Sequence, residues 1–184
     1  RWVDPPAPRR ARYVEKLGLP EYDAGVLTAS KETSDWFELA LQHTQNAKAL
    51  SNFIMGEMMR LLSEQDLAIS ESKVTPEKLA QIIALIDAKT ISTGAGKQVF
   101  EVVFNEGGDP KAIVEEKGLA QVSDDSALEG WAEDAIASNP KPAEEYKAGN
   151  AASINFLMGQ VMKASRGKAN PGAVMQMLKQ KLDG

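Results

Sequence analysis

The segment from residue 155 to residue 171 combines an apolar helical stripe with a cluster of cations. Cations in the last turn of a helix complement its carbonyl end, so simple helix capping is one interpretation. Over residues 147–184, however, six basic residues stand against one acid, a balance of 6 − 1 = +5 in a chain of net charge −5. Such asymmetry favours a local anion-binding face on an otherwise acidic protein. The stripe comprises Phe156, Leu157, Val161 and Met162, and the basic residues are Lys147, Lys163, Arg166, Lys168, Lys179 and Lys181.

Two other patterns could carry chemistry, and each has a simpler interpretation. The run Thr93–Lys97 is rich in glycine, but a phosphate loop needs four residues between its glycines and Ser or Thr after the lysine, where Gln98 stands. A linker that caps the following helix is the favoured interpretation. Paired acids at 124–125, 133–134 and 144–145 could act as acid and base. Without a pocket signature nearby, they favour a solvated acidic face.

The composition limits the class of protein. The 184 residues are 43% hydrophobic and 26% charged, which is typical of a soluble globular protein with one ordinary domain or two small ones. No apolar run approaches the roughly 18 residues of a membrane helix, and no secretory signal pattern is present. The absence of Cys excludes disulfides and thiolate chemistry, and a single histidine, His43, argues against a transition-metal site. A cytoplasmic protein is expected, and the missing initiator Met predicts that the chain begins inside a longer one.

The elements that must position the cations are predicted to be helices. Almost every apolar stretch has helical period, and no strand pattern is present, so the predicted fold class is all-α. Thr75-Pro76 and Asp109-Pro110 are strong helix starts, because a capping side chain precedes proline at the first helical position. One helix is expected over residues 47–62, with a connector over residues 21–29. The phrases Asn52–Arg60 and Asn155–Lys163 echo each other, and their glycines would let another helix approach closely.

Several segments together resemble one known family. They resemble, in chain order, the C-terminal part of the B subunit of aspartyl/glutamyl-tRNA(Asn/Gln) amidotransferase, a helical domain followed by a Yqey-like tail domain. The resemblance covers nearly the whole chain. Its most specific part is the F-L-M-G-Q-V-M-K helix leading into G-K-A-N-P; the other segments are Arg9–Ala24, Asp35–Glu38, Glu115–Leu119 and Trp131–Pro140.

The resemblance implies a domain organisation. Residues 1–24 would connect to a catalytic domain outside this chain, residues 25–106 would form the helical domain, and residues 107–184 would form the Yqey-like tail domain. The charge also shifts between the two parts: residues 30–106 carry 7 basic and 11 acidic groups, or 7 − 11 = −4, whereas the tail ends in the basic cluster.

The resemblance also implies a function. The full enzyme would activate misacylated Glu-tRNA(Gln) or Asp-tRNA(Asn) with ATP and Mg²⁺, and would amidate it with ammonia from a partner subunit. Its protein partners would be the amidase and small accessory subunits. This chain would bind tRNA, not DNA or a membrane, would hold no cofactor of its own, and would be inactive alone. The alternative is a helical interaction module whose basic tail docks an acidic partner protein; a free-standing Yqey-like protein is disfavoured by the long helical region upstream.

The expected RNA contacts come from matching the chain to the family motif residue by residue. Lys and Arg suit a sequence-tolerant clamp on the phosphate backbone, and Asn and Gln can add hydrogen bonds to sugars or base edges. Arg166 is added because it is charged and adjacent to the motif, and Lys147 because it is a cation that precedes the helix break at Gly149. The predicted RNA-binding residues are Lys147, Asn155, Gln160, Lys163, Arg166, Gly167, Lys168 and Asn170.

Overall fold

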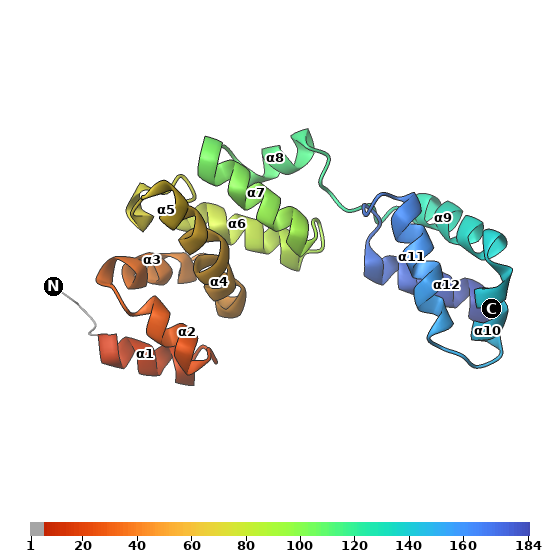
Figure 1. Ribbon diagram of the computed structural model, residues 1–184, viewed down its shortest axis with the longest axis horizontal. Coiled ribbons are helices and arrows are strands. Elements are labelled where there is room, and N and C mark those ends of the chain that lie inside the picture. The colour runs from red at the N-terminus through yellow and green to blue at the C-terminus, as the bar shows by residue number, and fades with distance from the viewer. Residues whose placement is uncertain (1–5) are drawn as a thin grey trace. The chain divides into compact units, whose positions relative to one another are not determined.

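The computed structural model describes residues 6–184, and over that range it contains helices, turns and loops but no β-strand. The all-α fold predicted from the helical periodicity is therefore confirmed. The chain folds as two compact units, the first ending at Gly118 and the second spanning Leu119–Gly184 (Figure 1). Each unit encloses its own apolar core.

The first unit is a bundle of short helices that includes one π-helical turn (η1) and one 3-10 turn (η2). As predicted, the side chains of Thr75 and Asp109 each accept a hydrogen bond from the backbone N–H three residues further on, which starts a helix. Ser30 caps α3 in the same way. In chain order the elements are α1 (Pro6–Glu15), α2 (Glu21–Leu27), α3 (Lys31–Leu41), α4 (Ala47–Phe53), η1 (Ile54–Met58), α5 (Met59–Gln65), η2 (Ile69–Glu71), α6 (Pro76–Asp87), α7 (Thr93–Glu106) and α8 (Pro110–Glu116).

Two local predictions in this unit are wrong. Most of the expected connector over residues 21–29 is helix α2. The helix expected over residues 47–62 is present as a continuous helical segment, but it contains the π-helical turn η1, which was not predicted. The glycine-rich run expected to be a linker is instead the start of α7, because the Ser92 side chain accepts a hydrogen bond from the Ala95 N–H and caps it.

Close helix packing depends on a different glycine from those predicted. A Cβ atom at Gly96 would lie 2.4 Å from Ile86 Cδ1, so this glycine lets α7 approach α6 closely. Gly56 and Gly159 do not serve this purpose, because a Cβ at either position would meet nothing within 4 Å. The sequence echo around those two glycines therefore does not mark two close helix contacts.

The compact units divide at a different place from the predicted domains. Helices α1 and α2 belong to the first unit rather than to a separate connector over residues 1–24; Arg9 Nη1 donates to Asp35 Oδ1 at 2.7 Å, and Tyr13 Oη donates to Glu38 Oε1 at 3.0 Å. Helix α8 packs against α6 and α7 and buries Ile113. For this reason the division follows Gly118 rather than residue 106.

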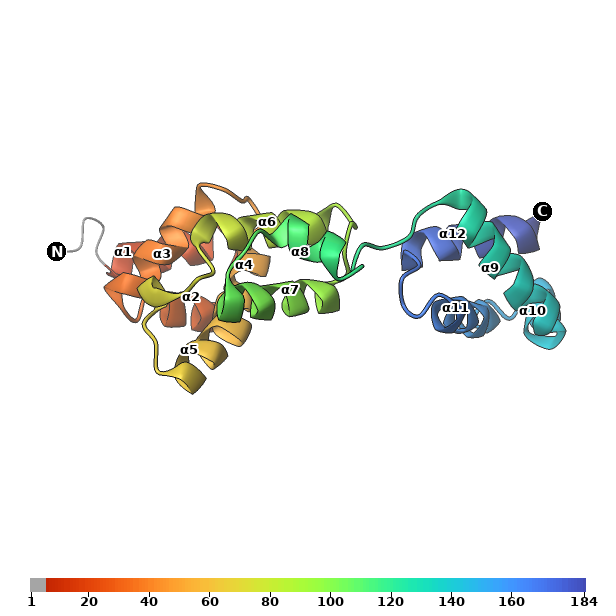
Figure 2. The ribbon, with the colours of Figure 1, turned by 90° about the horizontal axis from the view of Figure 1, so that it is seen from above.

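The second unit is a bundle of helices in which α11 contacts α9, α10 and α12, as the two views of the ribbon show (Figures 1 and 2). The half-buried Trp131 packs against the core. The helices are α9 (Asp125–Ser138), α10 (Pro140–Lys147), α11 (Ser153–Ala164) and α12 (Pro171–Asp183). The buried core consists of Leu128, Ala132, Ala135, Ala143, Ile154, Leu157, Val161, Ala169, Val174, Leu178 and Leu182.

Candidate nucleic-acid interface

Helix α11 has one face in the core and one face in solvent. The core face is the helical stripe formed by Ile154, Leu157 and Val161. Phe156, which the sequence analysis placed in the apolar stripe, is instead 51% exposed. Its position is one residue before Leu157, about 100° around the helix from the buried stripe, since a helix has 3.6 residues per turn.

The C-terminal end of α11 is closed by a Schellman motif. The Gly167 N–H donates to the Met162 carbonyl oxygen at 2.8 Å, and the Arg166 N–H donates to the Lys163 carbonyl oxygen at 3.1 Å. Both residues of the turn have left-handed backbone conformations, with φ of 56° at Arg166 and 77° at Gly167. The turn fixes the direction of the chain directly after the helix, so the cations around it stand on a defined backbone.

The loop between α11 and α12 is held in place on its inner side. Ser165 is buried, and its Oγ accepts a hydrogen bond from the Ala169 N–H at 3.2 Å. The backbone of Val122 pairs with this loop: its N–H donates to the Lys168 carbonyl oxygen, and its carbonyl oxygen accepts from the Asn170 N–H at 2.9 Å. The loop is therefore anchored in the second unit by both its backbone and its buried side chains.

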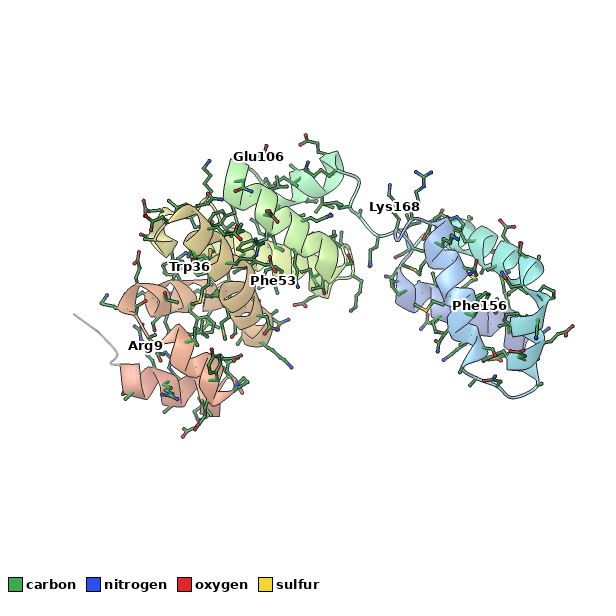
Figure 3. The ribbon with its side chains drawn as sticks, viewed as in Figure 1. Arg9, Trp36, Phe53, Glu106, Phe156 and Lys168 are labelled. Carbon is green, nitrogen blue, oxygen red and sulfur yellow. The ribbon has the colours of Figure 1, made fainter. Side chains whose placement is uncertain are left out.

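Three exposed cations surround this anchored loop. Lys163 lies in the last turn of α11, Arg166 in the Schellman turn and Lys168 just beyond it, and all three side chains are exposed (Figure 3 labels Lys168). Among the residues that the structure describes, no ion pair involves any of the three, whereas Lys181 is paired. The arrangement presents three positive charges from a fixed backbone, which suits contact with neighbouring phosphates.

Asn170 has a structural position. Its Oδ1 accepts hydrogen bonds from the N–H groups of Gly172 and Ala173, at 3.0 and 3.3 Å, and so caps α12. Its Nδ2 donates to Ser123 Oγ at 3.3 Å. Because both ends of the amide are engaged, the structure accounts for this residue without a ligand.

The remaining predicted site residues are spread along α11 and beyond it. Lys147 is exposed at the end of α10, next to the start of α11, so the length of α11 separates it from Lys163. Asn155 is exposed near the start of α11, and Gln160 is half-buried. The structure therefore brings together Lys163, Arg166, Gly167, Lys168 and Asn170, and leaves the other three apart.

Acidic side chains on α9 reduce the basic area. Lys181 Nζ donates to Glu133 Oε1 at 2.9 Å and to Glu129 Oε1 at 3.3 Å. The hydrogen bond to Glu133 raises the pKa of Lys181, and the same bond lowers the pKa of Glu133. Lys181 is thus neutralised locally and adds little to the positive surface of the unit.

Sequence reasoning missed Phe156 as a surface residue. The signal was present, because Ile154, Leu157 and Val161 alone complete a helical stripe at positions i, i+3 and i+7. Adding Phe156 to that stripe counted apolar type and ignored angular position.

Three other kinds of feature are absent from the described part of the chain. Over residues 6–184 no group of three or more His, Cys, Asp or Glu side chains is placed to hold a metal ion. The glycine-rich run at the start of α7 is helical, so it does not form a phosphate-binding loop that could fit ATP. No helix in the described range is long and apolar enough to cross a membrane.

Known proteins match this chain over both units. Residues 35–182 match the family described as the GatB domain. The chain belongs to the GatB domain family. It is 48% identical over 181 residues to the B subunit of aspartyl/glutamyl-tRNA(Asn/Gln) amidotransferase from Caldicellulosiruptor bescii, and 45% identical over 179 residues to the protein of that name from Alkalilimnicola ehrlichii. The alignments cover 97% of this chain and 38% and 37% of those relatives.

This GatB-family chain therefore spans well under half the length of the relatives it matches. The family named from sequence motifs is confirmed, and the matched range includes both α11 and the cationic loop. The similar protein from Chlorobium phaeobacteroides, 46% identical over 179 residues, carries the same name.

Proposed function

We propose that this chain is a tRNA-binding region of the B subunit of an aspartyl/glutamyl-tRNA amidotransferase. The observation that carries the proposal is the fixed loop at the end of α11, which presents Lys163, Arg166 and Lys168 without ion-pair partners among the described residues. Its relatives are named for a tRNA-dependent amidotransferase, which supports RNA as the polyanion. Phosphate contacts from Lys and Arg would fix the position of the tRNA without reading its sequence.

The acidic helix α9 would restrict how the RNA lies. Asp124, Asp125 and Asp134 are exposed on this helix or at its start, and they would repel phosphates. A tRNA bound to the cationic loop would therefore meet repulsion on the α9 side of the unit. For this reason, we expect the tRNA to contact the side of the second unit that carries the cationic loop and not the α9 side.

The wider role belongs to the longer protein. In this proposal the chain positions misacylated Glu-tRNA(Gln) or Asp-tRNA(Asn) for ATP- and Mg²⁺-dependent transamidation at a site outside these residues. The amidase and small accessory subunits would be its partners in the cytoplasm, and the chain alone would show no turnover. Of these proposed roles, only the contact with RNA is assigned to particular residues of this chain.

A binding assay separates tRNA recognition from docking of an acidic protein. The chain is titrated with a labelled tRNA transcript and with a scrambled RNA of equal length. Tighter binding of tRNA, lost in the Lys163→Ala/Arg166→Ala/Lys168→Ala variant, supports the proposal. The matched control is Lys48→Ala/Lys111→Ala/Lys141→Ala, which removes three exposed cations elsewhere and should bind as the original chain does. Equal, weak binding of both RNAs would overturn the proposal.

A further inference from the structure

Phe156 is an exposed aromatic side chain with no structural reason to be aromatic. It is 51% exposed on α11, on the side away from the core stripe (Figure 3). Within residues 6–184 the other large apolar side chains that are exposed are Tyr22 and Leu39, both in the first unit. In the second unit, therefore, the apolar surface open to a partner is centred on this ring.

The helix surface next to the ring is exposed. Gly159 lies one helical turn further on, is exposed, and would have nothing within 4 Å of an added Cβ. Asn155 is exposed beside the ring, and Lys163 is exposed two turns along. At 1.5 Å per residue, Phe156 and Lys163 are about 10 Å apart along the helix axis. With this spacing, a planar group can lie over the Phe156 ring and Gly159. An anionic group bonded to that planar group can then reach Lys163.

In the first unit, the phenylalanine of the matching sequence phrase is covered by a neighbouring helix. Phe53 occupies the position in Asn52–Arg60 that Phe156 occupies in Asn155–Lys163. The Phe53 ring is buried and stacks on Phe100 of α7, with centroids 5.6 Å apart and planes 26° apart. At Phe156 the second unit supplies no such ring from the described residues, so this ring stays exposed.

The surrounding charges favour an RNA base as a ligand for this ring. Lys163, Arg166 and Lys168 lie toward one end of α11, whereas Glu145, which accepts a hydrogen bond from Ser153 Oγ at 3.2 Å, lies at the other. A chain of phosphates would run from the ring toward the cations and away from the carboxylate. Unpaired bases of RNA loops stack on aromatic side chains in this way.

We propose that Phe156 and Gly159 form a stacking platform for one unpaired tRNA nucleobase, with Asn155 placed to hydrogen-bond the base edge. The proposal rests on the RNA binding proposed above and adds a base contact to its phosphate contacts. The platform holds a splayed-out base, so an RNA without an unpaired nucleotide at the contact would bind through the cations alone.

Substitutions on the platform test this directly in the whole chain. Phe156→Leu keeps an apolar side chain but removes the ring, and should weaken binding of a labelled tRNA transcript about tenfold. Its salt dependence should not change, because no phosphate contact is lost. Phe156→Trp should restore the affinity. Tyr22→Leu, which removes an exposed aromatic ring from the first unit, is the matched control and should bind normally.

A second variant removes any ambiguity from misfolding. Gly159→Gln replaces glycine with a good helix former at an open position, so the unit should melt at a higher temperature. Its side chain would nevertheless cover the platform, and binding should weaken. If the original chain binds tRNA and loses affinity on removal of the three cations, but Phe156→Leu and Gly159→Gln bind normally, the platform is refuted while the proposed function stands. If the original chain does not bind tRNA, both fail.

Discussion

Arg166 has a backbone conformation that L-amino acids other than glycine seldom adopt. Its φ of 56° places it at the left-handed position of the Schellman motif, where glycine is the usual residue. A left-handed conformation costs a non-glycine residue about 1–2 kcal/mol. Arginine at this position therefore costs the second unit some stability.

Replacing Arg166 separates its effect on stability from its effect on binding. Arg166→Gly should stabilise the second unit by about 1 kcal/mol, because the strain is relieved. It should also weaken tRNA binding and reduce the salt slope by about one unit, because one phosphate contact is lost. Thermal melts and fluorescence titrations measure the two quantities. Arg166→Lys, which keeps both charge and strain, serves as control; a stabilised Gly variant with unchanged binding would show that the residue only terminates α11.

Part of the candidate site could be predicted from the sequence, and part of it could not. Local patterns identified the cations and the capping positions, since these depend on neighbouring residues in the chain. Phe156 was misplaced because its angular position was ignored, although the spacing of Ile154, Leu157 and Val161 already indicated which side of α11 meets the core. Asn170 was expected to contact RNA, but the structure shows its amide capping α12 and bonding Ser123, contacts that only the folded loop brings together.

At the scale of helices, the contact between α1 and α3 contains a tyrosine with a raised pKa. Burial raises the pKa of Tyr13 to about 12; the hydrogen bond between Tyr13 and Ser34 opposes the effect, and the charge of Glu38 adds to it. Below about pH 10 the tyrosine is neutral in both folded and unfolded chains. Between about pH 10 and 12 only the unfolded chain ionises it, so the free energy of unfolding should fall over that window.

An ultraviolet titration of the folded protein checks this expectation. The phenolate absorbance should rise in more than one phase, with a last phase near pH 12 from Tyr13. Tyr13→Phe should abolish the phase near pH 12. If the highest phase persists in the Phe variant, the buried contact between α1 and α3 is not as described.

The contact between α6 and α7 depends on Gly96. A valine there would press on Ile86 and Ile82, since even a Cβ atom would lie 2.4 Å from Ile86 Cδ1. Gly96→Val should therefore lower the free energy of unfolding by about 1–3 kcal/mol in denaturant titrations. Gly130→Val, at an open position in α9, is the matched control and should change little. Equal effects of the two substitutions would contradict the close approach of α6 and α7.

The positions of the helices were largely predictable from the sequence, but the helices that each one packs against were not. Capping side chains at Thr75 and Asp109 act on backbone groups three residues away, so the sequence alone locates them. The π-helical turn at Ile54–Met58 and the short helix α2 depend on packing against other helices, which no local pattern specifies. The burial of Ile113 in the first unit likewise moved the division between units to Gly118.

At the scale of the whole molecule, the chain consists of two units joined after Gly118. Limited proteolysis should cut first between Lys117 and Val122, since Lys117 and Gly118 are exposed and Val122 is tied to the loop before α12. Mass mapping of the fragments identifies the position. A first cut at Gly107–Gly108 would instead place α8 with the second unit.

The central claim is that the fixed loop after α11 binds RNA through three phosphate contacts. The most direct measurement is the affinity for tRNA at several salt concentrations, for the original chain and for Lys163→Ala/Arg166→Ala/Lys168→Ala, beside a circular-dichroism melt. The variant should stay folded, because exposed surface cations change stability by no more than about 0.5 kcal/mol. Its log–log salt slope should be flatter by up to about 2–3 units. Unchanged affinity and slope in a folded variant would contradict the account and leave the cations as helix capping alone.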